Sequence, residues 1–149
     1  MSNVRRRRAL VSAFSVLLLA SCGAAGGVRA AEAAGHVALI KGMDVGGADA
    51  AWFGTLGVNE KGCLGLVGSD GEPATVVIWP AGTTLDDDGN IRDDQGRTIR
   101  VGDAVEAGGG EELFVDNYPE QAELCLDDPT DDDAVVIVLW TVTRGSQAG

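Results

Sequence analysis

The hydrophobic positions of this chain fall into short segments, most of which are separated by glycine, proline or aspartate. Such segments, rich in β-branched and aromatic residues, are typical of strands, whereas an amphipathic helix repeats apolar positions every three or four residues. After residue 35 the pattern predicts strands at 37–40, 52–58, 63–67, 75–79, 97–101, 104–106, 113–115 and 134–142.

The clearest hairpin joins the predicted strands 63–67 and 75–79. Gly68-Ser69-Asp70-Gly71 lies between them, and aspartate and glycine tolerate the backbone angles of a tight turn. Pro80 cannot donate to a sheet, so the second strand is expected to end at Trp79.

The last hydrophobic segment, Ala134–Val142, is the most apolar one after residue 35. It is too short to cross a bilayer as a helix, and its β-branched residues favour a strand. We therefore expect a central strand that is buried on both faces. Gly108–Gly110 is expected to form a loop, and Tyr118–Leu124 a turn or two of helix that opens at Pro119.

Many short strands and almost no helical periodicity predict an all-β fold. The favoured architecture is a small closed or nearly closed, OB-like barrel of about five to seven strands, because closure removes exposed strand edges. A β-sandwich is the alternative.

The N-terminal segment has the pattern of an export signal. Arg5–Arg8 form a positive region, and Ala9–Ala20 form an apolar helical segment that is too short to be a confident membrane anchor. Leu19-Ala20-Ser21-Cys22 then resembles the lipobox of bacterial lipoproteins. The resemblance implies that the signal is cut before Cys22, that the Cys22 sulfur carries a diacylglyceryl group, and that the protein lies at the outer face of the cell membrane.

Two other interpretations of this segment remain open. An ordinary secretory signal would be cut later, near Val28-Arg29-Ala30. Arg7-Arg8-Ala9-Leu10 faintly resembles a twin-arginine export signal. On the lipobox interpretation, residues 1–21 are the signal peptide, 22–35 a flexible Gly/Ala tether, 36–145 the β-domain and 146–149 a disordered tail.

Removal of the signal makes the protein more acidic. The full chain has a net charge of −12, with 11 basic and 23 acidic residues. Four of the basic residues, and none of the acidic ones, precede Cys22, so the remaining charge is 7 minus 23, or −16. An acidic, lysine-poor surface argues against binding to nucleic acid, and it leaves membrane attachment to the lipid on Cys22.

Once Cys22 is assigned to lipid, two cysteines remain. Cys63 and Cys125 are expected to form a disulfide in an oxidising compartment. The bridge would close a loop of about 60 residues and stabilise the fold by about 4 kcal/mol. The pair lacks the Cys-x-x-Cys spacing of a redox site.

The sequence offers no catalytic, metal or cofactor site. His36 is the one histidine, and no serine has a credible base nearby. The acidic turn 84–95 places Asp86, Asp88 and Gly89 as in a calcium loop, but Thr84 and Gln95 occupy the first and last ligand positions. This turn, and the acidic cluster at 127–133, are therefore interpreted as solvated turns.

A second resemblance concerns the domain itself. Gly62–Leu64, Ile78–Thr83, Val101–Val105 and Gly108–Gly110 resemble a pattern in small secreted or lipid-anchored β-domain proteins of actinobacteria, most of them uncharacterised. It covers about a third of the chain and implies a compact barrel-like module, but no reaction.

Three functions are compatible with these features. The favoured one is a non-catalytic envelope lipoprotein whose β-domain binds a protein or small ligand, and Trp52 beside Phe53 is the candidate binding surface. The alternatives are a carboxylate-based hydrolase and a structural surface lipoprotein. Recovery of one consistent partner from crosslinked envelope would favour binding, a pocket with two facing carboxylates would favour hydrolysis, and uniform acidity without a cleft would favour the structural role.

Overall fold

The computed structural model describes residues 27–44, 46–47 and 50–145. The predicted signal peptide, Cys22 and the predicted tail at 146–149 lie outside the described residues. The elements, in chain order, are β1 (Val28–Ala33), β2 (His36–Lys41), β3 (Ala50–Val58), β4 (Leu64–Val67), β5 (Thr75–Trp79), β6 (Thr84–Leu85), β7 (Ile91–Arg92), β8 (Thr98–Ile99), β9 (Ala104–Leu113), α1 (Phe114–Asn117), α2 (Pro119–Cys125) and β10 (Val135–Arg144).

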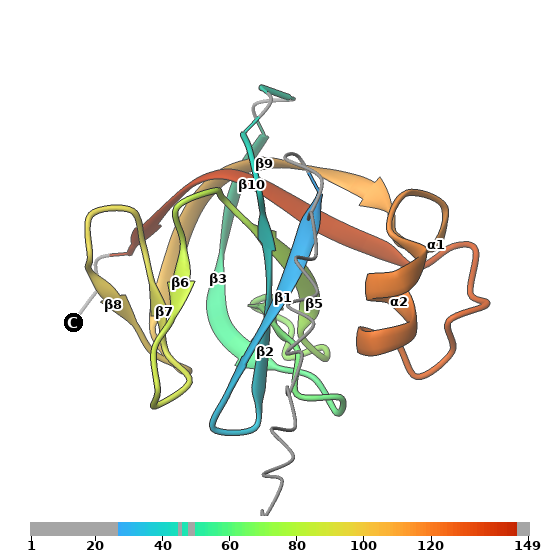
Figure 1. Cartoon of the computed structure of the whole chain (residues 1–149), viewed down its shortest axis with the longest axis horizontal. Helices are drawn as coiled ribbons and strands as arrows, with labels where there is room; N and C mark the ends of the chain where they lie inside the picture. Colours follow the sequence, from blue (N-terminus) through green and yellow to red (C-terminus); the bar gives the residue numbers. More distant parts are fainter. Residues whose placement is uncertain (1–26, 45, 48–49, 146–149) are drawn as a thin grey trace, which may run out of the picture.

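The fold is a small closed β-barrel with additional strands, as the all-β prediction expected (Figure 1). Its strands follow the order β5-β10-β9-β3-β4, and the pairing of β4 with β5 closes the ring. The pair β5–β10 is parallel and the other pairs of the ring are antiparallel. The hairpin β1–β2 joins this ring through a parallel pairing of β2 with β5.

Strand β10 separates two hydrophobic clusters, which confirms the prediction of a central strand buried on both faces. Ile137 and Leu139 pack into the cluster inside the barrel. Val136 and Val138 belong to a second cluster, between the outer face of the sheet and the helices α1 and α2. Alternate side chains of a strand point to opposite faces, so a continuous apolar run supplies both clusters.

The predicted hairpin 63–67/75–79 is also confirmed. Leu66 pairs with Thr75 in an antiparallel register, and β5 ends at Trp79, just before Pro80. The helical turn expected near Tyr118–Leu124 is present as α2, with Pro119 in its first turn.

A small sheet of β6, β7 and β8 is attached to the barrel. Its strands have two residues each, and Ile91 and Ile99, which pair across β7 and β8, are fully buried in the barrel cluster. Through these two side chains, the small sheet of β6, β7 and β8 packs against the core of the barrel.

Four local predictions were wrong. Val28–Ala33 is not tether but strand β1, fully paired with β2. Gly108–Gly110 is not a loop, since β9 runs through it. Phe114 and Val115 begin helix α1, and the strand expected at 97–101 is limited to Thr98–Ile99.

Candidate functional site

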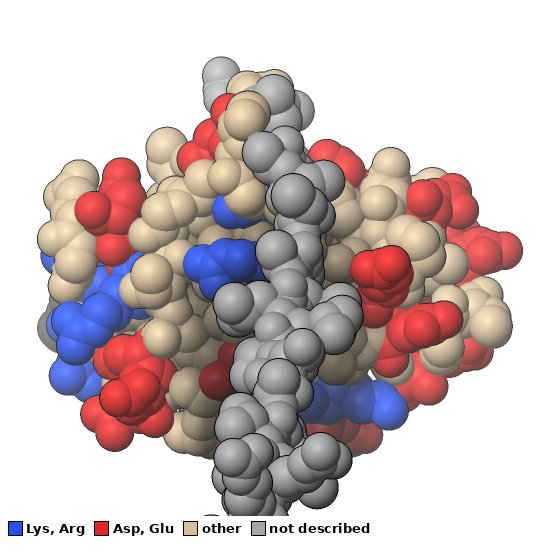
Figure 2. Space-filling view, viewed as in Figure 1, with Lys and Arg blue, Asp and Glu red and all other residues tan. Residues whose placement is uncertain are grey.

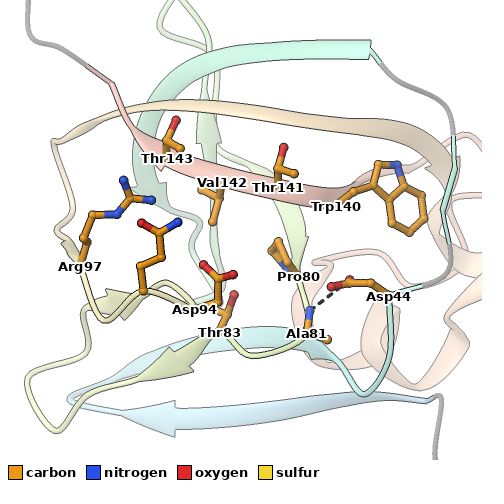
Figure 3. Close-up of a pocket in the computed structure, with 11 residues that line it drawn as sticks. Asp44, Pro80, Ala81, Thr83, Asp94, Arg97, Trp140, Thr141, Val142 and Thr143 are labelled. Atoms are coloured by element: carbon orange, nitrogen blue, oxygen red, sulfur yellow. Dashed lines mark hydrogen bonds between the residues drawn. The ribbon is translucent and has the colours of Figure 1, made fainter.

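A pocket of about 220 Å³ lies between the C-terminal half of β10 and the loops around the small sheet (Figure 3). Polar and apolar side chains line it together, and they come from four regions of the chain. These regions are the end of β10 (Trp140, Thr141, Val142, Thr143), the loop after β2 (Asp44), the turn after β5 (Pro80, Ala81, Thr83), and the turn between β7 and β8 (Asp94, Gln95, Arg97).

The β10 wall of this pocket is a strand edge. Strand β5 pairs with β10 only at Ile137 and Val138 and ends at Trp79, so β10 continues beyond its neighbour. The N–H of Gly145 donates to the carbonyl of Ala104 in β9 (2.8 Å). The hydrogen-bonding groups of successive strand residues alternate between the two edges. The backbone N–H and C=O of Thr141 and Thr143 therefore also point toward β9, and those of Val142 point toward the pocket.

On the pocket edge, therefore, no strand in the described part of the chain pairs with Val142. The backbone N–H and C=O of Val142 are available to an extended molecule in the pocket.

A buried lysine, Lys41, contacts two residues of the pocket lining, Asp44 and Trp140. The Nζ of Lys41 lies 3.0 Å from Oδ1 of Asp44 and 3.4 Å from the centre of a Trp140 ring, in a cation–π contact. Burial lowers the pKa of Lys41, and the hydrogen bond and charge of Asp44 oppose that shift. The same carboxylate accepts a hydrogen bond from the N–H of Ala81 (3.1 Å), so it joins the loop after β2 to the turn after β5.

The part of the pocket formed by Asp94, Gln95 and Arg97 belongs to a turn that is closed by hydrogen bonds to Asp93. Asp93 is buried, and its Oδ1 accepts the N–H groups of Gln95 (3.0 Å) and Arg97 (2.8 Å) while Nε of Arg97 bonds to Oδ2 (2.6 Å). Burial alone would raise the pKa of Asp93, but these hydrogen bonds outweigh it and lower the pKa. Asp94, next in the chain, is exposed, and Figure 3 shows its carboxylate directed toward β10.

The same turn occurs seven residues earlier. There Asp86 accepts the N–H groups of Asp88 (3.1 Å) and Asn90 (2.9 Å), and Gly89, like Gly96 in the later turn, has a positive φ. The spacing Asp-Asp-x-Gly at 86–89 and 93–96 is a sequence signal that could have revealed this repeat, which was not predicted. Asp86 and Asp93 of the predicted acidic turn therefore serve as turn acceptors.

No family model, curated protein or solved structure matches this chain. The site is therefore interpreted from its own geometry.

The two residues of the predicted aromatic surface lie on opposite faces of β3. Trp52 packs against the barrel cluster, and its Nε1 is buried. Phe53 points outward with 69% of its surface exposed, beside Glu106 of β9 in the register. The pair does not form one aromatic face, and neither residue lines the pocket beside β10.

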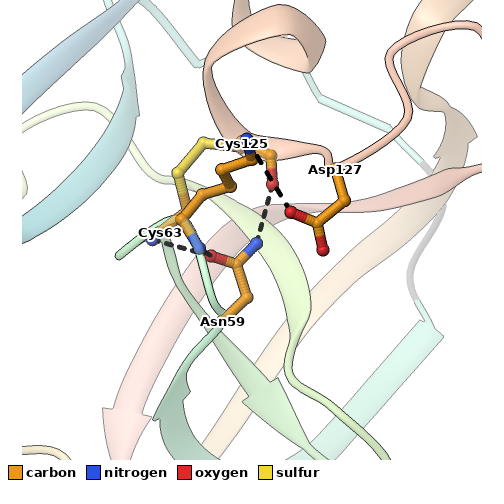
Figure 4. Close-up of a disulfide and its surroundings, with 5 residues drawn as sticks. Asn59, Cys63, Cys125 and Asp127 are labelled. Carbon is orange, nitrogen blue, oxygen red and sulfur yellow. Dashed lines mark hydrogen bonds and ion pairs between the residues drawn. A yellow bond between two sulfur atoms is a disulfide. The ribbon is translucent and has the colours of Figure 1, made fainter.

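The predicted disulfide is present. Cys63, just before β4, and Cys125, at the end of α2, form a bridge with a Cα–Cα distance of 5.7 Å, and both residues are fully buried. Asn59 supports it from both sides, because its Oδ1 accepts the N–H of Cys63 (2.9 Å) and its Nδ2 donates to the carbonyl of Cys125 (2.8 Å) (Figure 4). The bridge holds the helices against the barrel.

Other candidate groups have structural partners. Nδ1 of His36 lies 2.9 Å from the carbonyl oxygen of Gly89, which links β2 to the turn between β6 and β7. Asp128 accepts both the N–H and the hydroxyl of Thr130. Among the described residues there is no group of three or more histidine, cysteine or carboxylate side chains arranged for a metal ion, and no helix there is long and apolar enough to cross a membrane.

Acidic side chains dominate one side of the molecule. Figure 2 shows them over α2 and the loop that leads to β10, whereas both basic and acidic side chains lie over the small sheet. The polar pocket lies at the latter side, where charges of both signs are present.

Proposed function

We propose that this protein is a lipid-anchored protein of the outer face of the cell membrane, and that its barrel is a non-catalytic binding module. The observation that carries the proposal is the buried bridge Cys63–Cys125. Disulfides of this structural kind persist in compartments outside the cytoplasm and are rare within it. The bridge therefore supports export of the domain.

The hairpin β1–β2 supports cleavage before Cys22 rather than at the alternative site. A cut near residues 28–30 would fall inside β1, where Val28 pairs with Lys41 and Ala30 pairs with Leu39. A cut before Cys22 leaves the whole strand intact. A lipid on Cys22 would then lie a few residues from the folded barrel, and two or more acyl chains would hold it stably, since each buried methylene contributes about 0.8 kcal/mol.

The pocket beside β10 supports binding over a purely structural role. It is concave and lined by polar side chains beside apolar ones, so contacts of both kinds are available to a bound molecule. Two aspartates, Asp44 and Asp94, line it. Because Asp44 is engaged by Lys41 and by the N–H of Ala81, it serves to position the loop and does not offer a free acid for the hydrolase mechanism.

Metabolic labelling tests the anchor. The full chain would be produced in a bacterium that processes lipoproteins, grown with an alkyne-bearing palmitate. We expect acyl label on the wild-type protein and none on Cys22→Ala. The matched control, Cys63→Ala, should keep the label because it removes a cysteine from the folded domain only. Equal labelling of Cys22→Ala and wild type would refute the anchor.

A further inference from the structure

The edge of β10 in the pocket, together with Asp94, suggests the chemistry of a ligand. We propose that the pocket binds an extended, basic peptide segment, which adds to β10 as a strand and places a lysine or arginine against Asp94. The inference rests on the proposed function as a binding module, and it specifies the ligand class and the site.

The first support is the unpaired edge. The backbone of Val142 faces the pocket, and β5, the strand that would cover this position, has ended at Trp79. An extended peptide laid along the edge would bond to the backbone of Val142 as the next strand of a sheet does. Such pairing also satisfies backbone groups that otherwise depend on water.

The second support is the size of the pocket. Its volume of about 220 Å³ is below the range of roughly 300–1,000 Å³ for sites that enclose a drug-sized molecule. A short stretch of a longer chain fits this volume better than a large compact ligand.

The third support is the distribution of charge. Lys41 pairs with Asp44, Arg97 with Asp93, and Arg144 with Asp103. Asp94 has no hydrogen bond or ion pair among the described residues, so its carboxylate is open to a ligand. In Figure 3 that carboxylate points across the pocket toward β10, where the side chain of a peptide paired with Val142 would lie. Charge complementarity therefore selects a cationic side chain.

Fluorescence anisotropy tests this site with the full-length protein in detergent micelles. The probe is a fluorescein-labelled peptide Thr-Val-Lys-Val-Thr with a blocked C-terminus. We expect saturable binding that Asp94→Asn weakens about tenfold, the scale of one lost charge-assisted hydrogen bond. Asp87→Asn is the matched control, because Asp87 is the exposed equivalent of Asp94 in the preceding turn, and it should bind as the wild type does.

Two modified probes separate strand pairing from simple charge attraction. Methylation of the backbone nitrogens at both valines removes the donors of one edge, and replacement of lysine by glutamate reverses the charge. We expect each change to weaken binding at least tenfold. Equal binding of the methylated probe, or competition by butylamine as strong as by the peptide, would overturn the peptide assignment.

The outcomes also separate this inference from the proposed function. Binding that is unchanged in Asp94→Asn would remove the site but leave a binding module. No binding of the basic probe by an acyl-labelled protein would reject the ligand class but leave the anchor at Cys22 in place. Thermal melting of each variant shows that a loss of binding is not a loss of folding.

Discussion

The hydroxyl of Tyr118 is the group whose protonation most clearly depends on the fold. It donates to Oε2 of Glu112 (3.0 Å), and burial together with this carboxylate raises the pKa of Tyr118 to about 12 from an ordinary value of 10.0. A folded-state pKa above the unfolded one means that the folded state retains the proton longer. The corresponding stability is complete below pH 10 and is lost as the pH rises toward 12.

Tyr118→Phe should therefore lower the free energy of unfolding by about 1 kcal/mol at neutral pH, the usual net value of one hydrogen bond. The difference between the two proteins should shrink in urea unfolding at about pH 11 compared with about pH 8. Tyr118 is the one tyrosine of the chain, so no other tyrosine contributes to the comparison. A difference that stays constant over this range would contradict the role assigned to the hydroxyl.

At the scale of elements, the glycines of β9 allow close approach of neighbouring backbone. A Cβ added at Gly109 would overlap the carbonyl oxygen of Val138, whereas one at Gly108 would meet only the hydroxyl of Thr141. A side-chain hydroxyl can rotate away, but the backbone of a central strand cannot move without loss of pairing.

Gly109→Ala should consequently destabilise the protein by about 1–3 kcal/mol, as overpacking of a core does, and Gly108→Ala should cost less. Chemical unfolding of both variants gives the comparison. If the two variants were equally stable, the close approach at Gly109 would not be the reason for a glycine there.

The same glycines show why some elements could not be predicted from the sequence. Gly108–Gly110 has no side chains to mark a strand, and its extended form comes from pairing with β10 on one side and β3 on the other. Strand β1 likewise lacks an apolar pattern, since half of its side chains remain exposed. Its extended form comes from backbone pairing with β2. Runs such as Val135–Leu139, whose own burial drives strand formation, were predicted correctly.

The candidate site was harder to predict than the fold. Pro80 did indicate where β5 ends, but the pocket depends on how far β10 extends beyond β5 and on where the turn at Asp94 lies in space. Those are tertiary relations between segments that are distant in sequence. Trp52 and Phe53 do not form one aromatic surface, since neighbours in a strand point to opposite faces.

At the scale of the whole molecule, the disulfide connects the barrel to its helical cover. Its sequence separation is 62 residues, so the chain-entropy model gives a stabilisation of about 4 kcal/mol. A reductant, or the double variant Cys63→Ser with Cys125→Ser, should lower the melting temperature by many degrees. The reductant should not change the double variant further. If the reductant left the melting temperature of the wild-type protein unchanged, the bridge would contribute little to stability.

Under the proposed function, export and lipid attachment define the N-terminus of the mature protein. The most direct measurement is the mass of the full-length gene product after purification from the membrane of a lipoprotein-processing bacterium. The account predicts a chain that begins at Cys22, carries a diacylglyceryl group on that residue, and retains the bridge Cys63–Cys125. An unlipidated chain that begins near Val28–Ala30, or a chain with residues 1–21 still attached, would contradict it.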